Sequence, residues 1–218
     1  MEYSEEYEMR TCSIKECEAK HVANGYCRKH YQQIWKCGSI LERTMYTPND
    51  FVIDGDICRI GLYNLKGTLV GYTIIDAEDA EKCKQFKWRL QGPYACNDLI
   101  YLHHLILDCA PVKGKHADHI NGNSLDNRKI NLRMCSCSEN SSNRGKQENN
   151  KSGYKGVCWN KLINKWYVQI RKNSKVYYLG VFDDKDEAAK VWNKKAVELH
   201  GEFAYQNVIK PVLRRRKL

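Results

Sequence analysis

The chain has 218 residues, of which 42% are hydrophobic, and a formal net charge of +10. This length accommodates one large domain or two to three small ones. No apolar run approaches the ~18 residues of a membrane span, and the acidic N-terminus lacks the apolar stretch of a signal peptide. We therefore expect a cytoplasmic protein without a membrane partner.

The positive charge is concentrated in the C-terminal third. Residues 143–218 contain 18 Lys and Arg against 7 Asp and Glu, whereas residues 1–142 contain 18 against 19. Trp and Tyr alternate with the basic residues of 154–178. Because basic groups neutralise phosphates and release counterions, we interpret this end as a nucleic-acid surface rather than a solubilising tail.

The N-terminal segment, residues 1–48, has the cysteine pattern of a metal site. The eleven Cys of the chain are odd in number and follow no export signal, which argues against a disulfide framework. A C-x4-C-x9-C-x2-H pattern is formed by Cys12, Cys17, Cys27 and His30. Thiolate and imidazole ligands suit tetrahedral Zn²⁺, so we predict structural zinc here, with His21 or Cys37 as alternative ligands. The end of this pattern, CRKHYQQ, resembles the small zinc knuckles at the head of phage endonucleases.

Residues 49–98 are predicted to be a β-rich scaffold. β-branched and aromatic residues alternate with polar ones and are interrupted by glycines, which is typical of short antiparallel strands. Residues 77–88 favour a short helix, with Trp88 in the core. The apolar run 99–107, LIYLHHLIL, is expected to form a further strand.

Residues 117–143 combine an Asp-His pair with a crowd of Asn. The imidazole of His119 accepts a proton near neutral pH. On a strand the preceding Asp118 points to the other side, so one of the pair can bind a metal while the other faces a water. Asn oxygens are neutral ligands that suit Mg²⁺, and Asn amides also hold irregular loops. The segment therefore has the composition of a loop around a cation.

The run LHHLIL…ADHINGN…LDNRKINLR…SEN resembles the HNH endonuclease family, in particular phage and intron homing endonucleases with a ββα-metal core. The resemblance implies that residues 99–143 are the nuclease core and that His119 is the general base. It further implies that Asp118 and Asn140 bind one Mg²⁺ or Mn²⁺ and that Asn131 ties the loop together and positions His119. The expected products carry a 5′-phosphate and a 3′-hydroxyl.

Further polar residues surround this motif. His103 matches the family's strand histidine and is expected to be a supporting polar residue, whereas His104 stands where the family commonly has Arg. Arg133 and Arg144 are candidates for phosphate contact. The two cysteines of MCSCSEN depart from the family pattern, and we interpret them as packing thiols.

Residues 154–207 follow a linker at 144–153 and are predicted to form three strands and a helix that begins at Asp183 or Asp184. GYKGV, KWYVQIR, YLGVF and EAAKVWNKKA resemble the plant ethylene-response-factor DNA-binding domain, which implies a three-stranded sheet in the major groove. By position in that family, the residues facing DNA are Lys155, Gln169, Arg171 and Tyr178. Trp166 and Trp192 are expected in the core.

Together these patterns predict a modular α+β protein that ends in a basic tail at 208–218. Our hypothesis is a phage-encoded HNH endonuclease of homing type that acts on double-stranded DNA as a monomer, with a dimer as the alternative. The competing interpretation is a sequence-specific DNA-binding regulator with a silent nuclease core. An RNA-directed nuclease or binder is a third possibility.

Overall fold

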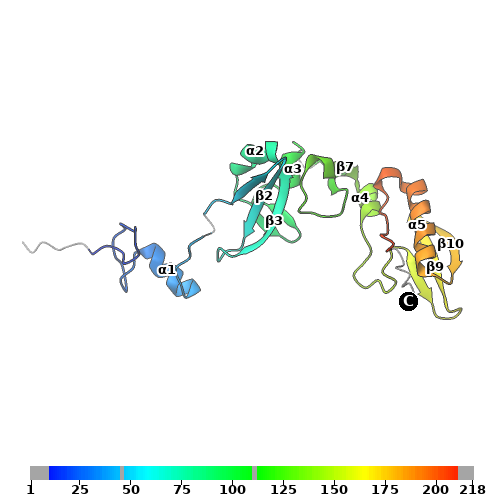
Figure 1. Cartoon of the computed structure of the whole chain (residues 1–218), viewed down its shortest axis with the longest axis horizontal. Helices are drawn as coiled ribbons and strands as arrows, with labels where there is room; N and C mark the ends of the chain where they lie inside the picture. The colour runs from blue at the N-terminus through cyan, green and yellow to red at the C-terminus, as the bar shows by residue number, and fades with distance from the viewer. Residues whose placement is uncertain (1–9, 45–46, 110–111, 211–218) are drawn as a thin grey trace, which may run out of the picture.

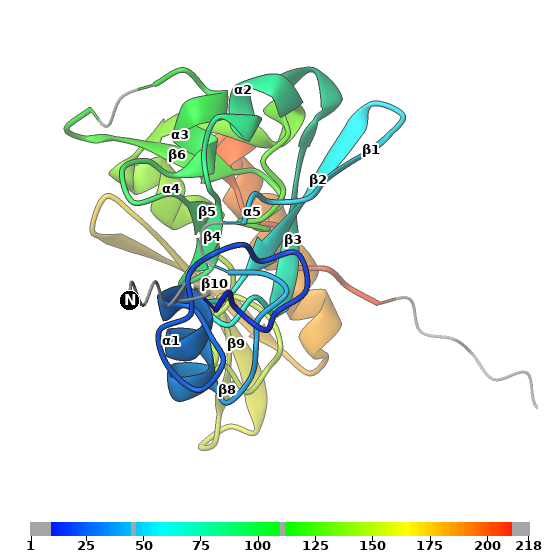
Figure 2. The same cartoon turned by 90° about the vertical axis from the view of Figure 1, so that its left-hand side faces the viewer.

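The computed structural model describes residues 10–44, 47–109 and 112–210, so most of the predicted basic tail lies outside the described residues. Three bodies follow one another along the long axis (Figure 1): a small segment around α1 (Arg28–Cys37), a central body, and a C-terminal module around α5 (Lys185–His200). Viewed from the end, the hairpin of β1 (Phe51–Asp54) and β2 (Ile57–Tyr63) projects from the side of the central body (Figure 2). Within the described ranges, none of the helices has the length and apolarity to cross a membrane.

The central body contains small antiparallel sheets and short helices. Its first part consists of β1 (Phe51–Asp54), β2 (Ile57–Tyr63), β3 (Leu69–Asp76), η1 (Ala77–Asp79), α2 (Ala80–Lys84), β4 (Arg89–Gln91), β5 (Tyr94–Cys96) and α3 (Leu102–Ile106). The sheet order is β1-β2-β3, and β4 pairs with β5. The prediction of short antiparallel strands followed by a helix near 77–88 is therefore confirmed.

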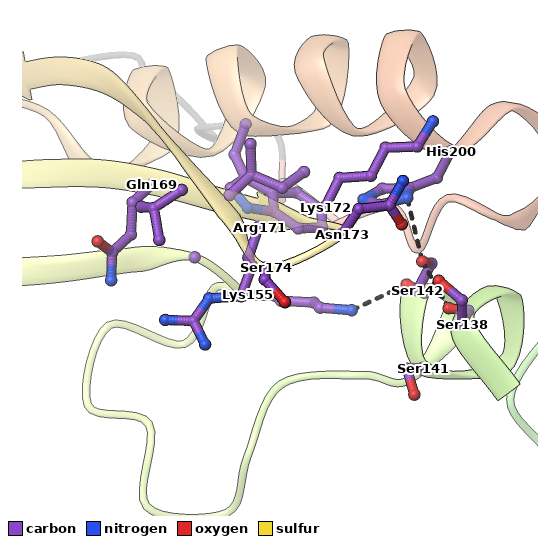
Figure 3. A pocket seen from close by; sticks show the side chains of 14 residues that line it. Ser138, Ser141, Ser142, Lys155, Gln169, Arg171, Lys172, Asn173, Ser174 and His200 are labelled. Atoms are coloured by element: carbon purple, nitrogen blue, oxygen red, sulfur yellow. Dashed lines mark hydrogen bonds between the residues drawn. The ribbon is translucent and has the colours of Figure 1, made fainter.

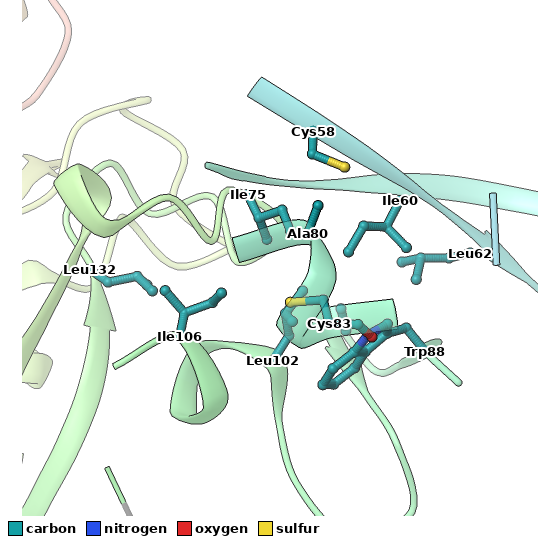
Figure 4. Packing of buried hydrophobic residues seen from close by; sticks show 11 residues of the cluster. Cys58, Ile60, Leu62, Ile75, Ala80, Cys83, Trp88, Leu102, Ile106 and Leu132 are labelled. Carbon is teal, nitrogen blue, oxygen red and sulfur yellow. The ribbon is translucent and has the colours of Figure 1, made fainter. Parts of the chain in front are cut away.

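One hydrophobic core holds this body together (Figure 4). β2 and β3 contribute Ile60, Leu62 and Ile75, and Trp88 is fully buried, as the sequence predicts. The core also includes residues from α3 and from β7 (Leu132–Ser136): Leu102, Ile106 and Leu132. The predicted scaffold and the predicted nuclease segment thus share one core, so the scaffold supports the candidate site directly.

The prediction of a strand over residues 99–107 is wrong. Residues Leu102–Ile106 form the helix α3, and Tyr101 precedes it in an extended conformation. Leu102, His103 and Ile106 are buried while the intervening positions are half-buried, which is the face of a helix rather than the alternation of a strand. A short apolar run is ambiguous between the two structures, and packing against the core selects the helix here.

The second part of the central body is a hairpin followed by a helix. It consists of β6 (Lys115–His119), η2 (Lys129–Asn131), β7 (Leu132–Ser136) and α4 (Cys137–Asn143). Ser136 caps α4 in a reciprocal capping box with Glu139, which fixes where the helix begins. The loop between the strands is attached to β3, because Ile74 N donates to Leu125 O and Asn127 N donates to Ile74 O.

The C-terminal module is a three-stranded antiparallel sheet covered by one helix. Its elements are β8 (Val157–Asn160), β9 (Lys165–Lys172), β10 (Lys175–Phe182), α5 (Lys185–His200) and η3 (Gly201–Phe203). Asp184 is the N-cap of α5 and accepts from two backbone amides, so of the two predicted caps the second is correct. Trp192 is buried against Gly156, whose positive φ and lack of a Cβ make this contact available. Trp166 is half-buried against the same core.

Candidate active site

The predicted site residues gather at the loop end of the β6–β7 hairpin. Asp118 and His119 end β6 and pair with Arg133 and Leu132 of β7. α4 follows β7 directly and brings its own polar residues to the same place. A cavity of about 240 Å³ is lined by Tyr94, Ala117, Asp118, His119, Gly122, Ser124, Asn140, Asn143, Arg144 and Gly145. The structure therefore brings Asp118, His119 and Asn140 to one concave surface.

Asp118 is buried and hydrogen-bonded on both oxygens. The Nε atom of Arg133 donates to Oδ2 at 2.9 Å. The amide of Asn143 donates to both carboxylate oxygens at 3.0 Å and to the carbonyl of His119 at 2.9 Å. Asn143 thus fastens α4 to the end of β6. The sequence interpretation missed this residue, although it lies three positions after Asn140 and hence on the same helix face.

His119 is buried, with its ring enclosed by polar and aromatic groups. Its Nε2 atom lies 3.2 Å from Oδ1 of Asn127, and the rings of Tyr94 and His103 lie 6.1 and 5.3 Å from its own. Burial lowers the pKa of His119 below the ordinary imidazole value, and this outweighs the opposing effects of Asn127 and the Asp118 charge. The ring is therefore neutral at neutral pH, the form that accepts a proton.

Asn131 bonds backbone groups within the loop between β6 and β7, and among the described residues no hydrogen bond joins it to the His119 ring. Its carbonyl oxygen Oδ1 accepts from the amide of Asn121 at 2.9 Å, and its Nδ2 donates to the carbonyl of Asp126 at 2.7 Å. The residue that holds the ring is Asn127, which the sequence interpretation did not single out. Tyr94 was also missed, because its position on β5 carries no sequence signal for a role at this site.

His103 packs against the His119 ring and does not line the cavity. Its ring is perpendicular to that of His119 and stacks on Tyr101 at a centroid distance of 5.4 Å. Burial lowers the pKa of His103 to about 3, so this imidazole stays neutral. On α3, rather than on the predicted strand, His103 is buried and His104 is half-buried at its edge.

The donor set of the cavity suits one hard divalent cation. Asp118 offers a carboxylate and Asn140 an amide oxygen, and both line the same polar cavity. Mg²⁺ is commonly held by one or two carboxylates together with water and substrate phosphates, so a single acidic ligand is sufficient. Among the described residues, Oδ1 of Asp118 accepts a hydrogen bond from Asn143 alone and retains a lone pair for an ion. The side chains of Asp118 and Asn140 therefore fit one Mg²⁺ or Mn²⁺ ion.

The N-terminal segment contains four ligand atoms in a zinc-like arrangement. The ligand atoms of Cys12, Cys17, Cys27 and His30 all lie within 4.8 Å of one another, and this is the cluster found among the described residues. Cys17 and Cys27 sulfurs are 3.9 Å apart, close to the ~3.8 Å separation expected around tetrahedral zinc. Cys37 and His21 are not part of this cluster.

The thiol of Cys12 ionises more readily than an ordinary cysteine thiol, because its pKa is lowered. Burial opposes its ionisation, but hydrogen bonds from the Cys27 backbone and the His30 side chain outweigh burial and lower its pKa to about 6. The Cys12 sulfur lies 3.2 Å from Nδ1 of His30. The cluster is compatible with structural zinc.

Of the two arginines predicted to contact phosphate, one lies at the cavity and one does not. Arg144 is exposed and lines the cavity. Arg133 is engaged elsewhere: it pairs with Asp118, donates to the Glu202 carbonyl at 2.8 Å and lies over the Phe203 ring at 4.1 Å. Arg133 thus links the candidate site to the end of the C-terminal module.

Three of the four predicted DNA-facing residues share one exposed face of the C-terminal sheet. Gln169 and Arg171 are exposed on β9, while Val168 and Ile170 between them are buried. Tyr178 pairs with Gln169 across the strands and is 64% exposed. Figure 3 shows Gln169 and Arg171 on the side of the sheet opposite α5, at a cavity of about 620 Å³ that α4 closes from the other side.

Lys155, the fourth, contacts the protein itself. Its ammonium group donates to the backbone carbonyls of Ser142 and Arg144, at the end of α4 (Figure 3). Burial, with a smaller contribution from the Arg144 charge, lowers the pKa of Lys155 to about 8. The structure therefore gives Lys155 a role in joining the module to α4 that the sequence did not suggest.

Comparison with known proteins places the chain among viral relatives. It is 28% identical over 172 residues to an uncharacterized HNH endonuclease of Acanthamoeba polyphaga mimivirus, covering 75% of this chain and 87% of the relative. It is 35% identical over 92 residues to protein 3.8 of Escherichia phage T7, covering 42% and 75% respectively. No family model and no solved structure matches the chain. The similarity to the mimivirus protein relates the chain distantly to an HNH endonuclease. The chain belongs to the same family as protein 3.8 of phage T7.

Proposed function

We propose that this protein is a metal-dependent DNA endonuclease of the HNH type. The observation that carries the proposal is the cavity in which Asp118, His119 and Asn140 meet, at the junction of a β-hairpin and the helix that follows it. One carboxylate, one imidazole and one amide are the groups that single-metal phosphodiester hydrolysis needs. The relationship to the mimivirus HNH endonuclease supports the same conclusion.

In this proposal His119 accepts the proton of the attacking water, because its buried ring is neutral and lines the cavity. Asp118 and Asn140 hold one Mg²⁺ or Mn²⁺ ion. When bound, that ion supplies Lewis-acid stabilisation of the charge on the phosphate and on the departing 3′ oxygen. Asn143 keeps the Asp118 carboxylate in place, and Arg144 at the cavity rim contacts an adjacent phosphate. The products carry a 5′-phosphate and a 3′-hydroxyl.

The C-terminal module is proposed to bind duplex DNA through its exposed sheet face, in the manner of ethylene-response-factor domains. Arg and Gln side chains can read guanine and adenine edges in the major groove. Arg144 and Gly145 line both the active-site cavity and a second cavity of about 630 Å³ beside Lys146, Lys151 and Lys161. Arg144 and the neighbouring lysines could therefore contact successive DNA phosphates between the sheet and the catalytic residues.

Two further features belong to the proposal. One catalytic cavity per chain favours nicking by a monomer, with homing as the biological setting and the cytoplasm of a bacterial host as the compartment. Zinc in the N-terminal cluster holds a segment that contributes no residue to either hydrophobic core among the described residues.

Cleavage of plasmid DNA that contains the region flanking the protein's own gene tests the proposal. With Mg²⁺ or Mn²⁺ the wild type should nick the plasmid, and His119→Ala should slow cleavage about 10²- to 10⁴-fold. His116→Ala is the matched control, because His116 lies on the same strand but is exposed and outside the cavity. Equal cleavage by wild type and His119→Ala would show that the assigned site is wrong.

The second candidate is a DNA-binding regulator with a silent nuclease core. It is favoured by the three hydrogen bonds that the Asp118 carboxylate already accepts from two nitrogens, Nε of Arg133 and Nδ2 of Asn143. A regulator would bind its DNA tightly without cutting it in the presence of either Mg²⁺ or Mn²⁺. Tight, sequence-specific binding combined with intact substrate after long incubation would replace the nuclease proposal with this one.

A further inference from the structure

A buried chain of hydrogen bonds connects the His119 ring to strand β3 of the scaffold. His119 Nε2 lies 3.2 Å from Asn127 Oδ1. Asn127 Nδ2 donates to Thr73 Oγ1 at 2.8 Å, and Thr73 Oγ1 donates to the carbonyl of Leu125 at 2.9 Å. Asn127 is 1% exposed and Thr73 is fully buried, so no solvent competes for these bonds.

The directions of these bonds determine which ring nitrogen carries the proton. A backbone carbonyl only accepts, so the Thr73 hydroxyl must donate its one proton to Leu125. Thr73 Oγ1 can then only accept from Asn127, which places the Asn127 amide nitrogen toward Thr73 and its oxygen toward His119. Because an amide oxygen also only accepts, the hydrogen atom of the neutral His119 ring lies on Nε2.

The other nitrogen of the ring is left bare. Among the described residues, no group makes a hydrogen bond to Nδ1 of His119. Nδ1 is also absent from the buried side-chain atoms that lack a partner, so it is accessible to solvent. Nδ1 is therefore open on the side of the ring away from Asn127, and His119 lines the cavity shared with Asp118 and Asn140.

We propose that Asn127, supported by Thr73, is a positioning residue that holds His119 as the Nε2–H tautomer and turns its bare Nδ1 toward the cavity as the proton acceptor. The role of Nδ1 as base rests on the proposed nuclease function, whereas the state of the ring does not. In a neutral imidazole, a hydrogen-bond acceptor at one ring nitrogen holds the proton there and leaves the other nitrogen free to accept one.

The backbone of the loop makes this arrangement rigid. Asn127 N donates to the carbonyl of Ile74 at 2.8 Å, and Ile74 N donates to the carbonyl of Leu125 at 2.9 Å. Asn127 is thus fixed to β3 through its main chain and, by way of Thr73, through its side chain. The scaffold, for which the sequence suggested no chemistry, thereby sets the orientation of the candidate base.

Nitrogen-15 NMR of the histidine rings in the full chain, without DNA or divalent metal, tests the state of the ring directly. His119→Gln identifies the His119 signals. At a pH where the ring is neutral, the wild type should show a protonated Nε2, a bare Nδ1, and an Nε2 proton that exchanges slowly enough to be observed. Asn127→Ala should abolish the slow exchange, and Thr73→Val, which keeps the shape of the side chain but removes the hydroxyl, should accelerate exchange.

Asn123→Ala is the matched control, because Asn123 caps the Leu125 amide in the same loop without reaching the ring. This variant should leave the Nε2 proton signal unchanged, and Thr73→Ser should retain it. A wild-type ring protonated on Nδ1, or an Nε2 signal indifferent to Asn127→Ala and Thr73→Val, overturns the proposal. This readout stands whether or not the protein cleaves DNA, so it separates failure here from failure of the nuclease function.

In the cleavage assay Asn127→Ala and Thr73→Val should lower kcat about 10- to 100-fold with little change in KM, as loss of a histidine's orienting partner usually does. Asn127→Asp keeps an acceptor for Nε2–H and should recover most of the rate. A rise in KM at constant kcat would place Asn127 in DNA binding instead and contradict the positioning role.

Discussion

At the scale of single residues, the candidate site contains one carboxylate, one exposed arginine at the rim, and neutral polar groups. Asp118 is the carboxylate that lines the cavity, and its negative charge is balanced by Arg133 from the adjacent strand. His119 and His103 are both held neutral by burial. A site of this kind attracts a cation to Asp118 and keeps an unprotonated imidazole beside it.

The lowered pKa of His119 has a consequence for the pH dependence of cleavage. The neutral ring is the active form, so lowering its pKa extends activity toward acid. The acidic limb of log(kcat/KM) should therefore break below about pH 6.5, the ordinary imidazole value, with a slope of one. A break clearly above that value, measured at saturating metal, would show that the active ring is not the buried one.

The residues of this site were partly visible in the sequence. Asp118, His119 and Asn140 could be chosen because their side chains have the right chemistry, and the structure brings them together. Asn127 and Asn143 could not be separated from their neighbours by composition, since the surrounding segment is crowded with Asn. Which Asn holds the ring depends on the contact between the loop and β3, and such long-range contacts leave no local pattern.

At the scale of elements, α4 joins the candidate active site to the C-terminal module. Its face near the cavity carries Asn140 and Asn143, and its far end is capped by Lys155 from the module. The Ser142 hydroxyl also lies 3.1 Å from Nδ1 of His200 at the end of α5. These contacts connect the module directly to the helix that carries a proposed metal ligand.

Lys155→Met should weaken this junction. The substitution keeps the apolar stem but leaves two carbonyls at the end of α4 without their donor, a loss of about 1–3 kcal/mol in local stability. The 144–153 linker should then be cut faster by trypsin. Lys161→Met, an exposed lysine in the same module, is the control. An unchanged rate of proteolysis in the Lys155 variant would show that Lys155 does not hold the module against α4.

Zinc in the N-terminal cluster is tested by metal analysis of the purified protein. The wild type should contain about one zinc per chain, and Cys27→Ser should lose it because a structural site needs all four ligands. Cys37→Ser should keep it, since Cys37 lies outside the cluster. Loss of zinc should disorder the segment around α1 while the two hydrophobic cores remain folded. Equal zinc in both variants would refute the assignment of ligands.

Elements with a strong local pattern were predictable, and α3 was not. The three strands and the helix of the C-terminal module follow from clear alternation, short turns and an acidic N-cap. Residues 99–107 are apolar except for His103 and His104, and so short an apolar run does not distinguish a strand from a helix. There the fold was decided by burial of Leu102 and Ile106 in the core that also contains residues of β2 and β3, rather than by propensity.

At the scale of the whole molecule, the charge is divided as the proposed function requires. The excess of positive charge in residues 143–218 lies in and after the linker that leads to the C-terminal module, while the residues before it are nearly neutral. In the proposed function, DNA is bound first by the module and then reaches the cavity beside α4.

DNA affinity should accordingly fall steeply with salt, by about 0.9 decade per decade of salt for each phosphate that is neutralised. Arg171→Gln should lose about 1–3 kcal/mol on the specific site but little on unrelated DNA if Arg171 reads a base edge. Lys190→Gln on the solvent side of α5 is the control. Equal losses on specific and unrelated DNA, measured by fluorescence anisotropy, would limit Arg171 to a phosphate contact.

The anomalous scattering of manganese in a crystal of the protein bound to DNA tests directly whether the cavity holds a catalytic ion. We expect one ion between the Asp118 carboxylate and the Asn140 amide oxygen, with His119 facing a water beside the scissile phosphate. An empty space between those two side chains at saturating manganese, or a His119 ring turned away from the DNA, would contradict that expectation.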